Sequence, residues 1–191
     1  MKTILTFLLL LSVGCTPLVI KEPIGSNYTP EQLKEFEGTW MLEQNGEASA
    51  LIQLKLINEE GHFRTAYVEW DNEEQKFQLN ENEIILKKGN EYGILHLTSE
   101  DEEENPHDLL LITLFRITEK GKIEYWNTIS NETEAFLNSG ILKTENIDGD
   151  IVIVDKPEKI IQILEPKVVH LSDPDCVTTA TKLVRQDGVS D

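Results

Sequence analysis

The sequence predicts a mainly β fold, an antiparallel barrel of about nine or ten strands that is closed or nearly closed, with two or three short helices. From Gly38 onward apolar and polar residues alternate with a period of two, the pattern of strands that bury one face. Clusters of Gly, Asn, Asp and Glu interrupt this pattern about every ten residues, which is typical of an antiparallel meander. The hydrophobic content of 39% is sufficient for one core.

The first half of the chain is expected to form a short helix followed by strands. Thr29 is a favourable N-cap, Pro30 occupies the first helical position, and Leu33 and Phe36 are three residues apart, so we expect a helix over 30–36. Strands are expected from Gly38 and at 50–56, 62–70, 76–79, 83–87 and 92–97, with turns at 59–61, 71–73, 80–82 and 88–90.

The second half is expected to continue the β pattern and to add two helices. Leu109–Ile117 is the strongest apolar run of the domain and is expected to be a central strand. Asp148-Gly149 is a tight hairpin signal, and Asp155 is expected to cap a helix that has Pro157 in its first turn. The remaining strands are expected at 122–129, 141–145, 150–154 and 180–185, and the helices at 131–139 and 155–164.

The N-terminus indicates where the protein works. Lys2 is followed by an apolar run of about ten residues that ends at Gly14-Cys15, the pattern of a secretory signal peptide. A membrane-spanning helix needs about 20 apolar residues, so the run is too short to be one. The run and Cys15 resemble a bacterial lipobox, which implies that the Cys15 thiol is acylated, for example with palmitate. The alternative is an ordinary signal peptide with a cysteine near the cut.

These features divide the chain into four parts: a signal peptide (1–14), a lipidated Cys with its tether (15–32), a β-barrel domain (33–186) and a polar tail (187–191). Residues 16–29 contain Pro, Gly, Ser and Asn without an apolar period, so we expect a flexible tether. Thr16 stands where lipoproteins retained in the inner membrane carry Asp. The resemblance therefore implies a cell-envelope protein at the periplasmic face of the outer membrane.

The charge of the chain argues against several partners. Removing residues 1–14 takes one of the 17 basic residues and none of the 35 acidic ones, which leaves 16 against 35 and a formal charge of −19. Nucleic acids and anionic lipid surfaces require basic patches, so neither is an expected partner. If Cys15 carries lipid, Cys176 is unpaired, and no disulfide framework is possible.

No pattern in the sequence predicts catalysis, a metal or a cofactor. The four histidines, at positions 62, 96, 107 and 170, lack the spacing of metal ligands. The stretch 146–157 starts like a calcium loop but has Ile151 and Pro157 where that loop needs Gly and Glu. The acidic run 100–104 is expected to be a solvated loop. Cys176 follows acids that would raise the pKa of its thiol, so it is a poor nucleophile.

Gly38-Thr39-Trp40, at the start of a strand that follows a short helix, resembles the opening signature of lipocalin-type barrels. This resemblance implies that Trp40 closes one end of the barrel and that an Arg or Lys from the last strand packs across its indole ring. Arg185 is the residue expected in that place. The contact of a guanidinium with an indole is worth about 0.5–2 kcal/mol.

Most of residues 36–185 also resembles a group of bacterial lipoproteins that have no assigned activity. The resemblance rests on the order of the following features: Cys15, Gly38-x-Trp40, the strand Leu109–Arg116, a helix with Phe136, Gly140-x-Leu142, an acidic hairpin, the helix 157–164 and Lys182-Leu183-x-Arg185. It implies a fold and a location only.

The expected function is therefore that of a non-enzymatic lipoprotein, anchored to the membrane by its lipid, whose barrel binds a small apolar or amphipathic ligand. The alternative is an adaptor with a filled barrel that docks another envelope protein. A carrier needs an apolar interior with free space, whereas an adaptor needs an exposed apolar patch. An enzyme would need titratable groups that converge in a pocket.

Overall fold

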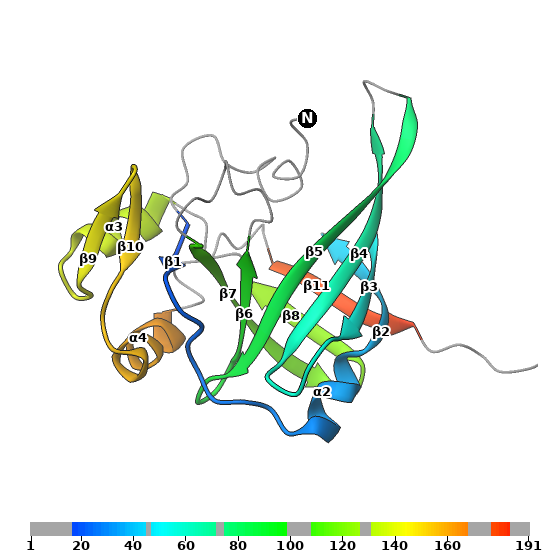
Figure 1. Ribbon diagram of the computed structural model, residues 1–191, viewed down its shortest axis with the longest axis horizontal. Coiled ribbons are helices and arrows are strands. Elements are labelled where there is room, and N and C mark those ends of the chain that lie inside the picture. Colours follow the sequence, from blue (N-terminus) through cyan, green and yellow to red (C-terminus); the bar gives the residue numbers. More distant parts are fainter. Residues whose placement is uncertain are drawn as a thin grey trace, which may run out of the picture.

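The computed structural model describes residues 17–44, 47–71, 75–98, 108–126, 131–167 and 177–183. Within these ranges the chain forms eleven strands, three α-helices and one 3₁₀-helix (Figure 1). The strands are β1 (Val19–Ile20), β2 (Gly38–Gln44), β3 (Glu47–Leu56), β4 (His62–Asp71), β5 (Lys76–Lys88), β6 (Gly93–Thr98), β7 (Leu110–Glu119), β8 (Lys122–Trp126), β9 (Thr144–Ile147), β10 (Asp150–Ile153) and β11 (Val177–Leu183). The helices are α2 (Pro30–Phe36), α3 (Asn131–Asn138), α4 (Pro157–Leu164) and the 3₁₀-helix η1 (Glu165–Lys167).

Eight of the strands close into an antiparallel barrel, which confirms the predicted fold class. Strands β2 to β8 follow one another around the barrel, and the pairing of β6 with β7 completes the wall on one side. Strand β11 pairs with β2 on one edge and β8 on the other, and so closes the barrel. The closed barrel therefore has fewer strands than the sequence predicted, because the others lie outside it.

The predicted turn at 80–82 is wrong, because β5 is one continuous strand. It pairs with β4 without interruption from Asp71↔Lys76 to His62↔Ile85. Asn80 and Asn82 lie on the same face of β5 as the buried Ile84, so their side chains belong to the barrel interior. Two asparagines in a polar stretch resemble a turn in the sequence, but long-range pairing with β4 determines the structure.

A second, smaller sheet branches from the barrel at β7. β1 pairs with Leu110 and Leu111, the first two residues of β7. It lies along the same edge of β7 that pairs with β8 from Leu114 onward. β10 then joins β1 in parallel, and β9 joins β10 antiparallel. This sheet, α3 and α4 lie together on one side of the barrel (Figure 1).

The predicted flexible tether is wrong for residues 17–29. This segment runs along the barrel wall, and its backbone is hydrogen-bonded to β7 and β5. It buries four apolar side chains that are at most 4% exposed: Leu18, Val19, Ile20 and Ile24. The sequence of this segment shows no hydrophobic periodicity, because most of the segment forms neither helix nor strand. A chain without regular secondary structure buries its apolar residues without a repeating pattern.

Two hydrophobic cores lie on opposite sides of the wall that β6 and β7 form. Alternation along β6 sends Leu95 and Leu97 into the barrel and Ile94 and His96 outward. The inner core includes Leu33, Phe36, Phe63, Ile84, Leu86 and Phe115. The outer core joins the wall to the N-terminal segment, α3 and α4, and includes Leu18, Ile20, Ile94, Ile112, Leu114, Leu137, Ile160 and Leu164.

The helix caps agree with the sequence at α2 and differ from it at α4. The hydroxyl of Thr29 accepts a hydrogen bond from Gln32 N at 3.3 Å, and Gln32 Oε1 accepts one from Thr29 N at 3.0 Å. At α4 the expected cap is wrong, because the N-cap is Lys156 and makes no side-chain cap bond. Asp155 instead accepts from Lys143 N at 2.7 Å and so fastens α4 to the preceding hairpin.

Candidate functional site

One end of the barrel is closed by α2 and a cluster of aromatic rings. The ring of Phe36, at the end of α2, packs edge-on against Tyr28, Phe63 and Phe115, with centroids 5.3, 6.3 and 5.8 Å away. Burial raises the pKa of Tyr28 to about 12. The backbone of Gly93 lies beneath Phe115, where an added Cβ would stand 2.1 Å from the ring. This end of the barrel is therefore a packed floor.

Gly38 and Trp40 lie at this closed end, and a lysine supplies the cation. Trp40 is 4% exposed, and its Nε1 donates to Phe36 O at 2.8 Å. Lys182 Nζ stands 5.7 Å from the Trp40 ring centroid and donates to Glu35 O at 2.6 Å. Gly38 has φ +123°, and an added Cβ would lie 3.1 Å from Lys182 Cε.

Arg185 lies outside the described residues, so its predicted contact with Trp40 stays a prediction. The cation over Trp40 in the described structure is Lys182, which the sequence analysis did not select. Lys182 is the register partner of Trp40 in the pairing of β11 with β2. Only that register distinguishes it from the other basic residues near the C-terminus.

Four buried polar side chains interrupt the apolar inward face of the barrel at a distance from α2. Thr65, Asn80, Thr113 and Thr178 are buried there, each beyond an apolar residue of the same strand that lies nearer the floor. Most of these groups are satisfied: Thr65 Oγ1 donates to Asn82 O at 3.2 Å. Burial raises the pKa of Tyr125, and a hydrogen bond with Thr178 opposes part of that rise.

Asn80 is the exception in this polar layer. Its side chain is 8% exposed, and it lies opposite Tyr67 on the inward face of β5. Among the described residues, Asn80 Nδ2 is the only buried side-chain nitrogen or oxygen without a hydrogen-bond partner. Such an atom is rare in folded proteins, and it costs about 1–3 kcal/mol when nothing accepts from it.

Part of the barrel interior remains accessible to solvent. Phe63 and Ile84 are 0% and 4% exposed, but other apolar residues that face inward are only partly buried. These residues are Ala50, Ile52, Leu95, Leu97, Ile123 and Tyr125. A side chain that faces the barrel axis and keeps solvent-accessible surface lies next to space that protein atoms do not fill.

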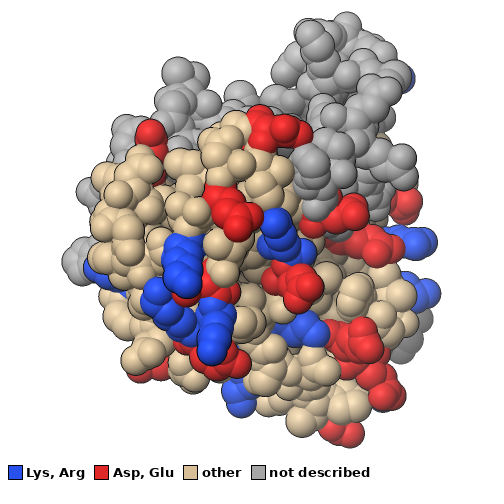
Figure 2. All heavy atoms as spheres, turned by 60° about the vertical axis from the view of Figure 1, so that its left-hand side comes forward, with Lys and Arg blue, Asp and Glu red and all other residues tan. Residues whose placement is uncertain are grey.

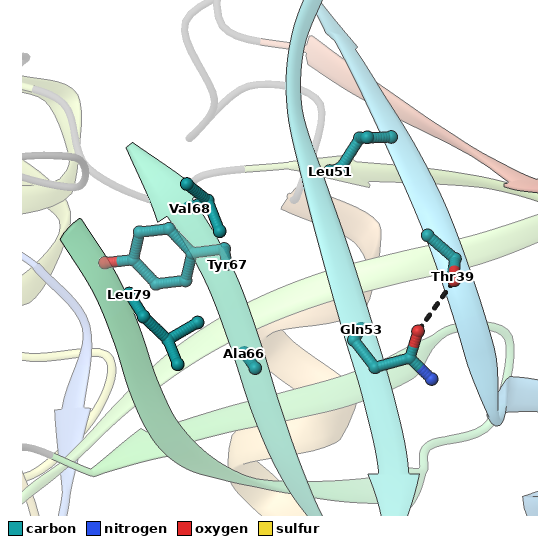
Figure 3. A pocket seen from close by; sticks show the side chains of 7 residues that line it. All are labelled: Thr39, Leu51, Gln53, Ala66, Tyr67, Val68 and Leu79. Carbon is teal, nitrogen blue, oxygen red and sulfur yellow. Dashed lines mark hydrogen bonds between the residues drawn. The ribbon is translucent and has the colours of Figure 1, made fainter. Parts of the chain in front are cut away.

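A shallow apolar hollow lies on the outside of the barrel, over β2 to β5 (Figure 3). It has a volume of about 350 Å³. Leu51, Val68 and Leu79 border it with 52%, 54% and 64% of their surfaces exposed. At its edge Thr39 Oγ1 donates to Gln53 Oε1 at 2.6 Å. The hollow offers apolar contact with few polar groups.

Two buried polar side chains fasten the outer layer to the barrel. Glu165 Oε1 accepts from the backbone nitrogens of residues 90, 91 and 92, at 2.7 to 3.2 Å, and so holds η1 against the β5–β6 loop. His96, which is fully buried, accepts from Ile24 N through Nε2 at 3.1 Å.

Both signs of charge are interspersed on the face of α3, α4, β9 and β10 (Figure 2). The ion pairs near this face are Lys21–Glu145 and Lys159–Asp155.

The other candidates from the sequence bring no further site together. Cys15, Cys176, His107, His170 and the acidic run 100–104 lie outside the described residues. In the described part of the chain, no three His, Cys, Asp or Glu side chains gather as metal ligands would. Among the same residues no helix has both the length and the apolar character to span a bilayer.

The fold and these surfaces define a lipocalin-like barrel with a closed floor, a partly polar interior and an apolar hollow on its outer wall. Barrels of this type are typically non-enzymatic. No family model, curated protein or solved structure matches the chain.

Proposed function

We propose that the protein is a non-enzymatic cell-envelope lipoprotein whose barrel binds a small apolar or amphipathic ligand. The observation that carries the proposal is the accessible inward face above the packed floor, where Ile52, Leu97 and Tyr125 keep part of their surface. A barrel of eight strands has an interior wide enough for side chains or for one small ligand. The signal sequence and Cys15 support an anchored position at the periplasmic face of the outer membrane.

The anchor is tested by Cys15→Ser, because acylation needs the thiol. Cell fractionation should find the wild-type chain with the membranes and the variant in the soluble fraction. A matched control, Ser12→Ala, changes the signal region but keeps the thiol and should stay with the membranes. A variant that remains membrane-bound without Cys15 would contradict the lipid anchor.

The ligand is tested by native mass spectrometry of the full chain carrying Cys15→Ser, purified without detergent. Shorter forms that begin near residue 24 are unsuitable, because they remove the buried residues Leu18, Val19 and Ile20. We expect an added mass that organic solvent removes. A chain without any added mass, even after incubation with apolar molecules, would contradict the carrier function.

The alternative, an adaptor for another envelope protein, is favoured by the outer hollow. Single exposed leucines are common, but Leu51, Val68 and Leu79 border one concave patch. A photo-crosslinking residue at Val68 should capture one envelope protein if the adaptor function is right. The same residue at the exposed Glu134 on α3 is the control, and equal labelling from both positions would argue against the hollow.

A further inference from the structure

Building on the proposed function, we infer that Asn80 is the polar recognition residue of the barrel and that the ligand is an uncharged amphipathic molecule with a carbonyl group, such as an ester or an amide. The Asn80 side chain is more than nine-tenths buried, points into the barrel, and carries the unpartnered Nδ2. An amide N–H in this position donates to whatever acceptor enters the interior. A carbonyl oxygen is the acceptor that an amphipathic molecule can place there.

The neighbours of Asn80 exclude a charged head group. Tyr67 lies opposite it on β4, and Asn82 and Thr65 lie one step nearer the floor on the same face. None of these side chains carries a charge, and the chain as a whole has a formal charge of −18. A carboxylate or phosphate brought to Asn80 would lose its water without gaining a cation, which is costly. A neutral carbonyl needs only one donor.

The arrangement also sets the orientation of the ligand. The floor below Asn80 consists of fully buried apolar side chains such as Phe63 and Ile84. The accessible inward surface includes apolar residues, Ile52 and Leu97 among them. The alkyl part of the ligand therefore rests on these residues, and its carbonyl lies at the level of Asn80.

The test compares an ester with an alkane that has the same number of carbon atoms. The full chain carrying Cys15→Ser is loaded with Nile red, a neutral fluorophore, which is then displaced by methyl laurate, tridecane or laurate. On the wild-type barrel, methyl laurate should act at a concentration about three- to tenfold below that of tridecane, the gain of one hydrogen bond. Laurate, which is charged, should be the weakest competitor.

The decisive variant is Asn80→Leu, which has a similar size and no donor. It should still bind Nile red, more weakly because the carbonyl of the dye loses the same donor, and it should lose the preference for the ester over the alkane. It should also melt no lower than the wild type, because the change removes a buried group without a partner. The control Thr65→Val removes a hydroxyl that is already hydrogen-bonded on the same face, and it should keep the ester preference.

A second measurement does not depend on any variant at position 80. In NMR spectra of ¹⁵N-labelled protein, the side-chain amide protons of Asn80 should shift downfield with methyl laurate and stay in place with tridecane. An ester preference that survives in Asn80→Leu, or amide protons that do not move, would overturn the role of Asn80 while leaving ligand binding intact. If Nile red and both competitors fail to bind, the proposed function fails, and the role of Asn80 fails with it.

Discussion

His96 makes the attachment of the N-terminal segment sensitive to pH. Its ring is 0% exposed, with Nδ1 3.1 Å from Ile85 O and Nε2 3.1 Å from Ile24 N. The neutral ring satisfies both contacts when Nδ1 donates and Nε2 accepts. Burial lowers the pKa of His96 to about 4, the hydrogen bond to Ile85 opposes this shift, and the charge of Lys87 adds to it.

The sign and size of the effect follow from the difference between the folded and unfolded states. The pKa falls from 6.5 in the unfolded chain to about 4 in the folded one, so the unfolded chain binds the proton more tightly. The stabilisation is complete above the unfolded value and is lost as the pH falls through the folded value. At ~1.4 kcal/mol for each pKa unit, folding loses about 3 kcal/mol over this window.

The assay is urea denaturation at about pH 7 and about pH 4, with His96→Gln as the comparison. Glutamine keeps an amide in place of the ring and does not titrate, while the carboxylates titrate alike in both proteins. Between the two pH values the wild type should lose about 3 kcal/mol more stability than the variant. When the pH is lowered, the protection factor of the Ile24 amide against exchange should also fall more than those of the amides in β4. Equal losses in the two proteins would refute the argument that protonation of buried His96 opposes folding.

Two further predictions concern the contacts made by Glu165 and by Lys182. Gly89→Ala places a Cβ 2.2 Å from Glu165 Oε1, so it should destabilise the protein by about 1–3 kcal/mol in thermal denaturation. Gly89→Ala should lower the stability clearly less when Glu165 has already been replaced by Ala. Equal losses of stability in the two backgrounds would contradict this contact. Lys182→Met should lower stability by about 1 kcal/mol, because the indole of Trp40 and Glu35 O lose their cation. Combined with Trp40→Phe, its effect should be less than additive, and full additivity would contradict the pair.

Local patterns in the sequence were sufficient for several of the strands and for the helix α2 at the start of the barrel. The alternation of residues in β3 and β4 predicted strands that the structure contains, because a half-buried strand needs this pattern whatever its partner. The apolar run of β7 also predicted a strand that the structure contains. Thr29 and Pro30 likewise predicted α2, since a capped first turn is determined within a few residues. Gly38 and Trp40 were selected as structural residues because Gly38-Thr39-Trp40 resembles the opening signature of lipocalin-type barrels.

The tertiary structure decided the features that depend on distant partners. β5 runs through its asparagines because it pairs with β4 without interruption from Lys76 to Ile85. Residues 17–29 are packed because the wall of β6 and β7 presents an apolar outer face. Lys182 lies over Trp40 through strand register alone. Asn80 gained its importance in the same way, because only the closed barrel determines which polar groups find a partner and which one does not.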